Sequence, residues 1–73
     1  AVDKWSPWEC DVKKFDWYYD EREIFYVLEG KVKVVTEDGE EAEFGKGDLV
    51  TFQQGVKCTW DVRERIKKVY RFG

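Results

Sequence analysis

The chain has 73 residues, of which 42% are hydrophobic and 18% aromatic, and its formal net charge is -3. This length suits one small domain over residues 1–73 and leaves too few residues for two separate hydrophobic cores. The mild acidity argues against nucleic acid as a partner, and the lack of any apolar run of about 20 residues argues against a membrane-spanning segment.

In the N-terminal half, short apolar runs alternate with polar residues, and this period of two is typical of half-buried β-strands. The run "WECDV" predicts a strand that places Trp8, Cys10 and Val12 on one face. The run "EIFYVLEG", which ends at Gly30, is nearly continuous in apolar character, and "KVKVVT" after it alternates lysine with valine. The Asp-Gly pair of "EDGE" then predicts a tight hairpin turn.

The C-terminal half continues the pattern. "EAEF" predicts a strand with Ala42 and Phe44 pointing inward, "GKGD" a turn, "LVTF" a strand and "QQG" a second turn. "KCTWDV" places Cys58, Trp60 and Val62 on one face, and "KKVYRFG" completes the series. Turns about every 8 to 12 residues are typical of an all-β sandwich or barrel, and closing the sheet removes its exposed edges. The best helical candidate, "DVRERIKK", is short and lacks an apolar stripe.

Basic residues are concentrated near the C-terminus, where they alternate with apolar residues such as Val62, Ile66 and Tyr70. Such alternation is typical of a strand with one solvated face, so we expect the bases to point outward, where they are balanced by the acidic remainder of the chain. The bases assigned to this face are Lys57, Arg63, Arg65, Lys67, Lys68 and Arg71.

The two cysteines, Cys10 and Cys58, lie in strand-like runs and do not make a disulfide framework. Because free thiols persist in reducing compartments, we expect an intracellular, cytoplasmic protein. The sequence shows no signal peptide, and its start at Ala1 also allows a plastid location if a transit segment has been removed.

Two spacings in the chain resemble the motifs of the cupin family. Glu23 followed by six residues and Gly30 fits the end of the family's first motif, and Gly47, Gln53 and Gly55 fit the start of the second. The segments "WSPWECDVKKFDWYYDEREIFYVLEGKV" and "GVKCTWDV" are similar in particular to short cupins grouped with (S)-ureidoglycine aminohydrolase and ethanolamine-utilisation cupin domains, many of them uncharacterised plant and bacterial proteins. The resemblance implies an all-β fold, a single-domain cupin jelly-roll β-barrel.

Many cupins hold a divalent metal with three histidines and a glutamate, but this chain contains no histidine. The resemblance places Trp17 and Tyr19 at the first two histidine positions, or the residue before each if the motif's gap is one residue longer. It places Cys58 at the third position and retains Glu23. A catalytic metal needs about three protein ligands, and a tyrosine that ionises near pH 10 rarely replaces an imidazole. We therefore expect neither a metal nor another cofactor.

The same alignment gathers a set of candidate ligand-pocket residues inside the barrel: Trp17, Tyr19, Glu23, Cys58 and Trp60. Glu23 fits either a structural carboxylate or a catalytic acid or base. Cys58 fits a small core residue better than a nucleophile, because its sequence neighbour Lys57 points to the opposite face and no histidine is present to activate a thiol.

Three functions follow from these residues. The first is metal-free binding of a small molecule in the barrel, which we expect. The second is a metal-dependent, aminohydrolase-like enzyme, as the resemblance implies, and whether the protein is an enzyme at all stays open. The third is a protein-interaction module whose barrel is a packed core. The expected partner is a small-molecule ligand, with neither nucleic acid nor a membrane, and a homodimer is also compatible with the sequence.

Overall fold

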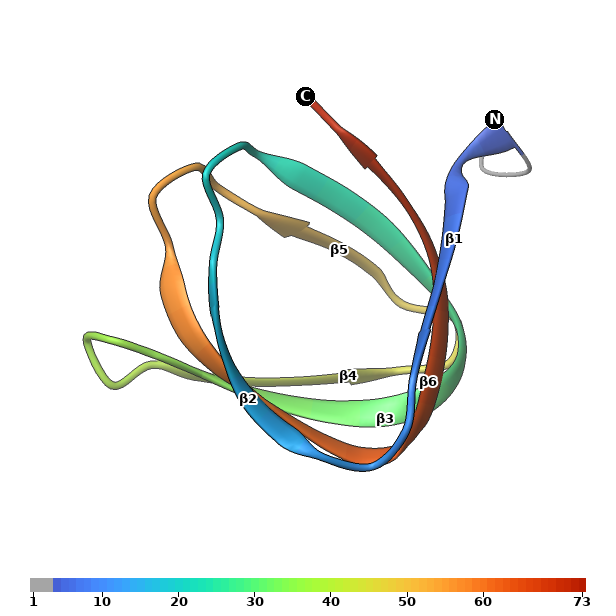
Figure 1. The fold of residues 1–73 in the computed structure, drawn as a ribbon, viewed down its shortest axis with the longest axis horizontal. Helices are drawn as coiled ribbons and strands as arrows, with labels where there is room; N and C mark the ends of the chain where they lie inside the picture. The colour runs from blue at the N-terminus through green and yellow to red at the C-terminus, as the bar shows by residue number, and fades with distance from the viewer. Residues whose placement is uncertain (1–3) are drawn as a thin grey trace.

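Strands that follow the predicted apolar runs make up nearly all regular structure in residues 4–73, the part of the chain that the computed structural model describes (Figure 1). Residues 1–3 lie outside the described part of the chain. The plastid alternative, which depends on the start at Ala1, therefore also concerns residues outside the described part. The six strands are β1 (Ser6–Cys10), β2 (Lys14–Tyr18), β3 (Glu23–Thr36), β4 (Glu41–Gly45), β5 (Leu49–Phe52) and β6 (Lys57–Phe72). No part of the described chain forms a helix that could cross a bilayer.

Two long strands, β3 and β6, organise the whole sheet. They pair with each other antiparallel, while β1 and β2 pair with β6, and β4 and β5 pair with β3. Figure 1 shows β3 and β6 curving so that the short strands bend around a common interior. The all-β fold expected from the sequence is therefore confirmed.

The curvature of β3 centres on Gly30, where the two predicted runs join into one strand. Before this point the buried positions are odd-numbered, as at Val27, and after it they are even-numbered, as at Val32. The register against β6 shifts between these two residues. Gly30 has a φ of 103°, and a Cβ there would lie 2.3 Å from the backbone oxygen of Arg65. Only glycine allows this bend and this close approach of two strands.

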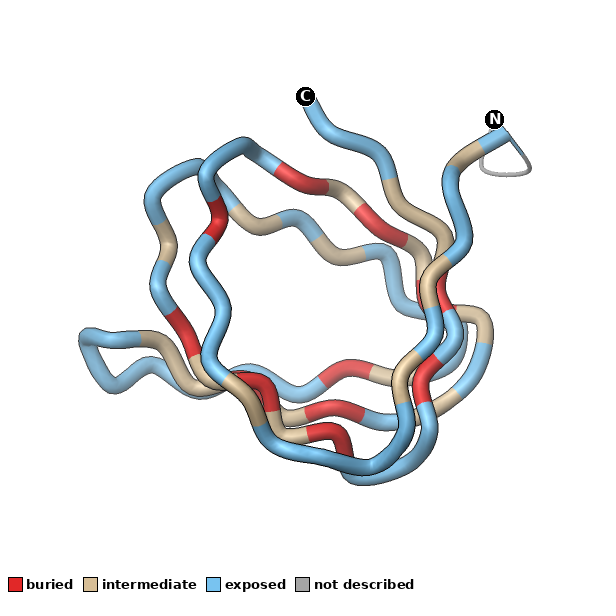
Figure 2. The backbone as a smooth tube through the Cα atoms, viewed as in Figure 1, coloured by how far each residue is buried: buried red, intermediate tan, exposed pale blue. Residues whose placement is uncertain are grey.

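Aromatic and valine side chains fill the interior, and Figure 2 shows that buried positions recur along β3 and β6. Trp60 is 2% exposed and contacts several other rings, among them Phe44, whose centroid lies 5.4 Å away. Two predictions are wrong: the extension of the first strand to Val12 and the inward orientation of Ala42. Val12 is 65% exposed because β1 ends at Cys10. Ala42 is exposed because it lies nearer the hairpin turn on a strand that has a neighbour on one side only.

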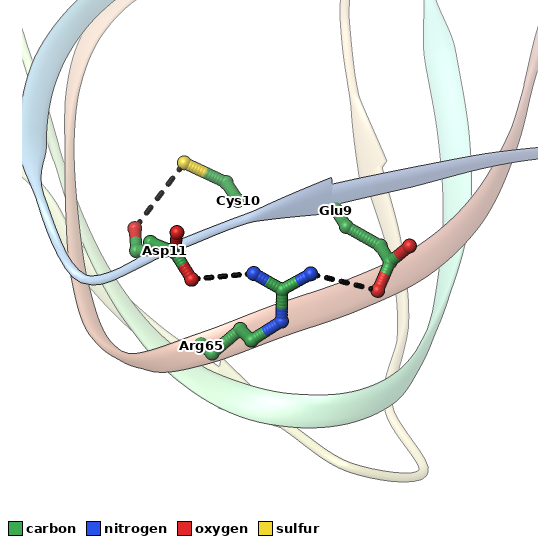
Figure 3. Close-up of polar contacts among 4 residues, drawn as sticks. All are labelled: Glu9, Cys10, Asp11 and Arg65. Carbon is green, nitrogen blue, oxygen red and sulfur yellow. Dashed lines mark hydrogen bonds and ion pairs between the residues drawn. The ribbon is translucent and has the colours of Figure 1, made fainter.

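Charged side chains on the outer surface join β1 to β6. Arg65 donates hydrogen bonds to Glu9, at 3.0 Å, and to Asp11, while the Cys10 thiol donates to the backbone oxygen of Asp11 at 3.3 Å (Figure 3). For Arg65, the expectation of an outward base paired with the acidic remainder of the chain is confirmed. Both cysteines are free thiols, as expected.

Candidate functional site

A cavity of about 180 Å³ opens into the barrel between β1, β2 and the two long strands. We call it the aromatic pocket, because seven of its lining residues are aromatic and border a carboxylate and an ammonium group. Its lining residues are Trp8, Phe15, Trp17, Tyr19, Glu23, Trp60, Lys68, Tyr70 and Phe72. A polar pair enclosed by apolar walls is the usual composition of a small-molecule site.

The polar part of the pocket is a buried ion pair. Lys68 Nζ donates a hydrogen bond of 2.7 Å to Glu23 Oε2, and the two residues are only 6% and 4% exposed. The β3–β6 register sets this geometry, since Lys68 lies opposite Val27 and its long side chain passes Phe25 to reach Glu23. All three β3 side chains point inward on alternate positions.

Four aromatic rings surround the Lys68 ammonium group. Its nitrogen lies 4.0 Å from the centroid of Phe25, 4.9 Å from that of Trp60, 5.0 Å from that of Trp8 and 5.5 Å from that of Tyr70. Ring faces attract a cation and stabilise it in an otherwise apolar site. Burial lowers the pKa of Lys68, while the Glu23 charge and hydrogen bond act in the opposite direction.

The structure brings four of the five predicted pocket residues together. Glu23 and Trp60 lie deep in the aromatic pocket, whereas Trp17 is 49% exposed at its rim. Tyr19 is buried, stacks on Phe52 with centroids 4.7 Å apart, and meets Trp17 edge-on at 6.4 Å. Burial, followed by the charges of Glu23 and Cys58, raises the pKa of Tyr19 far above its usual value, so its hydroxyl stays protonated.

The fifth predicted residue, Cys58, does not line the aromatic pocket. It is buried on β6 opposite Trp17, whose backbone oxygen accepts a hydrogen bond from the thiol at 3.7 Å. The residue is instead among those that line a more open groove of about 480 Å³, together with Lys57 and Thr59, while its side chain is buried in the core. Burial raises the pKa of the Cys58 thiol, and the nearby charge of Asp16 acts in the same direction.

The indole N–H of Trp60 is buried and has no hydrogen-bond acceptor among the described residues. It lies near the Tyr19 hydroxyl and the Cys58 sulfur and partly offsets the rise in the pKa of each group. It meets neither atom with hydrogen-bond geometry. These three side chains therefore adjoin one another in the interior.

The donor groups do not fit the metal centre that cupins commonly hold. Within residues 4–73, no three histidine, cysteine, aspartate or glutamate side chains cluster closely enough to hold a metal ion. The retained carboxylate of Glu23 is hydrogen-bonded to a cation of the chain itself, Lys68. Trp17 offers an indole, which is not a metal ligand, and Tyr19 a phenol that burial keeps protonated.

Lys68 is the pocket residue that the sequence analysis missed, since its assignment to the solvated face is wrong. The alternation contained the necessary signal, because Lys68 shares the parity of Trp60, Val62 and Ile66, all of which are buried. A lysine inside a barrel is rare unless it is paired, and its partner Glu23 lies on β3, which is adjacent in the sheet but distant in the sequence. The alternation of β6 therefore identifies the inner face on which Lys68 lies, and only its ion pair with Glu23 explains why a lysine is buried there.

The antiparallel barrel and its enclosed pocket define a small cupin. The model of the EutQ-like cupin domain matches residues 1–70, and the chain belongs to this family. The resemblance found in the sequence to cupins of the ethanolamine-utilisation kind is thereby confirmed. The curated proteins contain no match to the chain.

Solved structures agree with this assignment. The chain is similar to a DUF861 family protein of Thermotoga maritima, with 52% identity and a TM-score of 0.99 over 100% of this chain and 83% of that one. It is also similar to a putative ethanolamine utilization protein Q of Salmonella typhimurium, at 26% identity, and to the EutQ protein of Clostridium difficile, at 24%, each with a TM-score of 0.81. Each match covers 90% of this chain but only 53% of the Salmonella protein and 52% of the Clostridium protein, so the chain spans about half the length of each. At 24% identity, the likeness to the Clostridium protein shows the fold alone.

Proposed function

We propose that this protein binds a small molecule in the aromatic pocket without the help of a metal. The observation that carries the proposal is the Glu23–Lys68 pair, because both of its side chains line a cavity whose other walls are aromatic. The pair leaves one carboxylate oxygen and two ammonium protons free of each other, and these can hydrogen-bond a ligand. The rings supply apolar contact for the ligand's body.

The size and charge of the pocket restrict the ligand. Its volume of about 180 Å³ is below the range of about 300–1,000 Å³ typical of drug-sized ligands, so a compact metabolite fits. The ion pair is neutral as a whole. A carboxylate or an amine would have to compete with Glu23 or Lys68 for its partner, so an uncharged polar group such as a carbonyl, an amide or a hydroxyl fits better.

The two other functions receive less support. A metal-dependent aminohydrolase would need ligands at positions that Trp17, Tyr19 and Cys58 occupy, and the only retained family ligand, Glu23, is paired with Lys68. A barrel that served only as a packed core would leave no cavity bordered by a buried ion pair.

Nuclear magnetic resonance tests the proposal, because each indole N–H gives its own signal. We expect butanone, acetamide or benzyl alcohol to shift the indole signals of Trp8, Trp17 and Trp60, which line the pocket, and to leave that of Trp5 in place. The Glu23→Gln variant should weaken binding by about tenfold, the effect of one charge-assisted hydrogen bond.

The matched control is Glu41→Gln, which removes the carboxylate of the exposed Lys33–Glu41 ion pair, with atoms 2.5 Å apart, and should leave binding unchanged. Equal shifts at Trp5 and in the pocket, or no binding of any probe to the wild-type protein, would remove the basis for a ligand site here.

A further inference from the structure

We propose that Lys68 is a covalent binding site for small aldehydes and ketones, which it captures as a Schiff base inside the aromatic pocket. This inference rests on the proposed function, since the carbonyl compound must first enter the same cavity. Lys68 is the only buried lysine among residues 4–73, and its nitrogen lies within the lining of that cavity. A lysine desolvated in an apolar pocket is the usual form of a Schiff-base nucleophile.

Glu23 provides the proton acceptor that such a lysine needs. A proton that moves from Nζ to Oε2 along the 2.7 Å hydrogen bond gives a free amine and a carboxylic acid. No charge enters or leaves the pocket in this step, so it carries no new desolvation cost. Burial, which lowers the pKa of Lys68, acts in the same direction. The Lys68 amine can then attack a bound carbonyl group, and the protonated Glu23 is close enough to donate a proton to the carbonyl oxygen.

The reaction balances with these two residues alone. The Nζ lone pair forms a bond to the carbonyl carbon, and the carbonyl oxygen takes the proton held by Glu23. The resulting carbinolamine nitrogen returns one proton to Glu23, which passes it to the hydroxyl group, and that group leaves as water. The sum is a lysine ammonium plus a carbonyl compound giving a protonated imine plus water, with Glu23 ionised at the start and at the end.

The pocket stabilises the protonated imine by the same contacts that stabilise the Lys68 ammonium group. The protonated imine carries one positive charge on the same nitrogen, which Glu23 continues to balance at hydrogen-bond distance. The rings of Phe25 and Trp60, with centroids 4.0 and 4.9 Å from that nitrogen, stabilise the cation in both states. Enclosure by the apolar walls limits the access of water, which would hydrolyse the imine.

Trapping by reduction tests the inference in the wild-type protein. Acetaldehyde with sodium cyanoborohydride at neutral pH converts each imine into a stable ethyl-lysine, which tandem mass spectrometry of peptides can locate. We expect Lys68 to be modified about tenfold faster than Lys33, which is partly exposed and paired with Glu41. Accessibility alone predicts the reverse order, so modification of Lys33 before Lys68 would overturn the inference.

A pair of variants assigns the role of the carboxylate. Glu23→Gln should slow the modification of Lys68 by about tenfold, whereas Glu41→Gln should leave the rate at Lys68 unchanged. If Glu23→Gln fails to fold, the comparison of lysines within the wild-type chain decides the question without it. Indole shifts with butanone together with an unmodified Lys68 would refute covalent capture and leave non-covalent binding standing. If the probes shift no indole signal and Lys68 is also not modified, both proposals are refuted.

Discussion

Lys68 Nζ on β6 and Glu23 Oε2 on β3 lie 2.7 Å apart inside the barrel, although 45 residues separate them in the chain. The pair ties the last strand of the chain, β6, to the start of β3. Because the aromatic rings around the ammonium group exclude most water, each charge depends on the other.

We expect the loss of one partner to cost more than the loss of both. Lys68→Met leaves Glu23 buried and uncompensated, and should lower the free energy of unfolding by about 3–5 kcal/mol. The double variant Glu23→Leu, Lys68→Met replaces the pair by apolar side chains and should recover most of that loss. Urea unfolding measures both, and a double variant no more stable than the single one would contradict a coupled pair.

Trp60 should be among the most important core residues. Its ring is 2% exposed and lies within 6.0 Å of the centroids of Phe15, Phe25 and Phe44. Trp60→Ala should lower the free energy of unfolding by about 3–5 kcal/mol, the range for removing a buried aromatic side chain. Trp17→Ala, at a half-exposed ring, should cost about 1 kcal/mol. Near-equal thermal midpoints for the two variants would show that Trp60 does not support the core.

Gly30 should not tolerate a side chain. In Gly30→Ala the new Cβ would lie 2.3 Å from the Arg65 backbone oxygen and 2.7 Å from the Ile66 Cα, at a φ of 103°. We expect a loss of about 4 kcal/mol or more, measured by urea unfolding. Gly39→Ala is the control, since its φ is 89° with no atom near the added Cβ, and should cost about 1–2 kcal/mol. Equal losses would mean that backbone conformation, and not the contact with β6, makes Gly30 necessary.

The two thiols should differ in their rate of alkylation. Burial raises the pKa of Cys58, which lowers its reactive thiolate fraction near neutral pH, whereas Cys10 is only partly buried. Iodoacetamide at pH 7 should therefore label Cys10 first, and labelling of Cys58 should accelerate as the pH rises above about 8.5, the ordinary thiol pKa. Faster labelling of Cys58 at pH 7, located by mass spectrometry, would indicate an activating group near it.

Metal content gives a further prediction. The purified protein, expressed in medium supplemented with manganese, iron and zinc, should contain no stoichiometric transition metal, because Lys68 already occupies the carboxylate of Glu23. Elemental analysis measures this directly. One equivalent of metal that disappears in Glu23→Gln and persists in Glu41→Gln would contradict the metal-free proposal.

Much of the fold could be predicted from local patterns. The Asp-Gly turn forms as expected, with Gly39 at a φ of 89° and its N–H hydrogen-bonded to the Thr36 oxygen at 2.9 Å. Cys58, Trp60 and Val62 share a buried face. The failures at Val12 and Ala42 have different causes. The first strand ends at Cys10, before Val12, whereas Ala42 lies in a strand whose face no second neighbour covers, which alternation does not reveal.

The candidate site could be predicted only in part. Its aromatic residues and Glu23 follow from the motif spacing, because hydrophobic side chains on an inner face need no particular partner. The alternation puts Lys68 on the inner face, but it cannot predict its burial, because the cost of burying a cation is offset only by a specific carboxylate and by nearby rings.

The sequence by itself determined the apolar runs and the turns, because backbone conformation and side-chain periodicity are local properties. The joining of these runs into the long strands β3 and β6, with Gly30 bending β3, was decided by strand pairing. Only the tertiary structure decided that a lysine of the basic C-terminal segment lies inside the barrel and that Cys58, although buried, does not line the pocket that Glu23 lines. The physical reason is that burial of a charge depends on the distance to its counter-charge, and the pairing of β3 with β6 sets that distance.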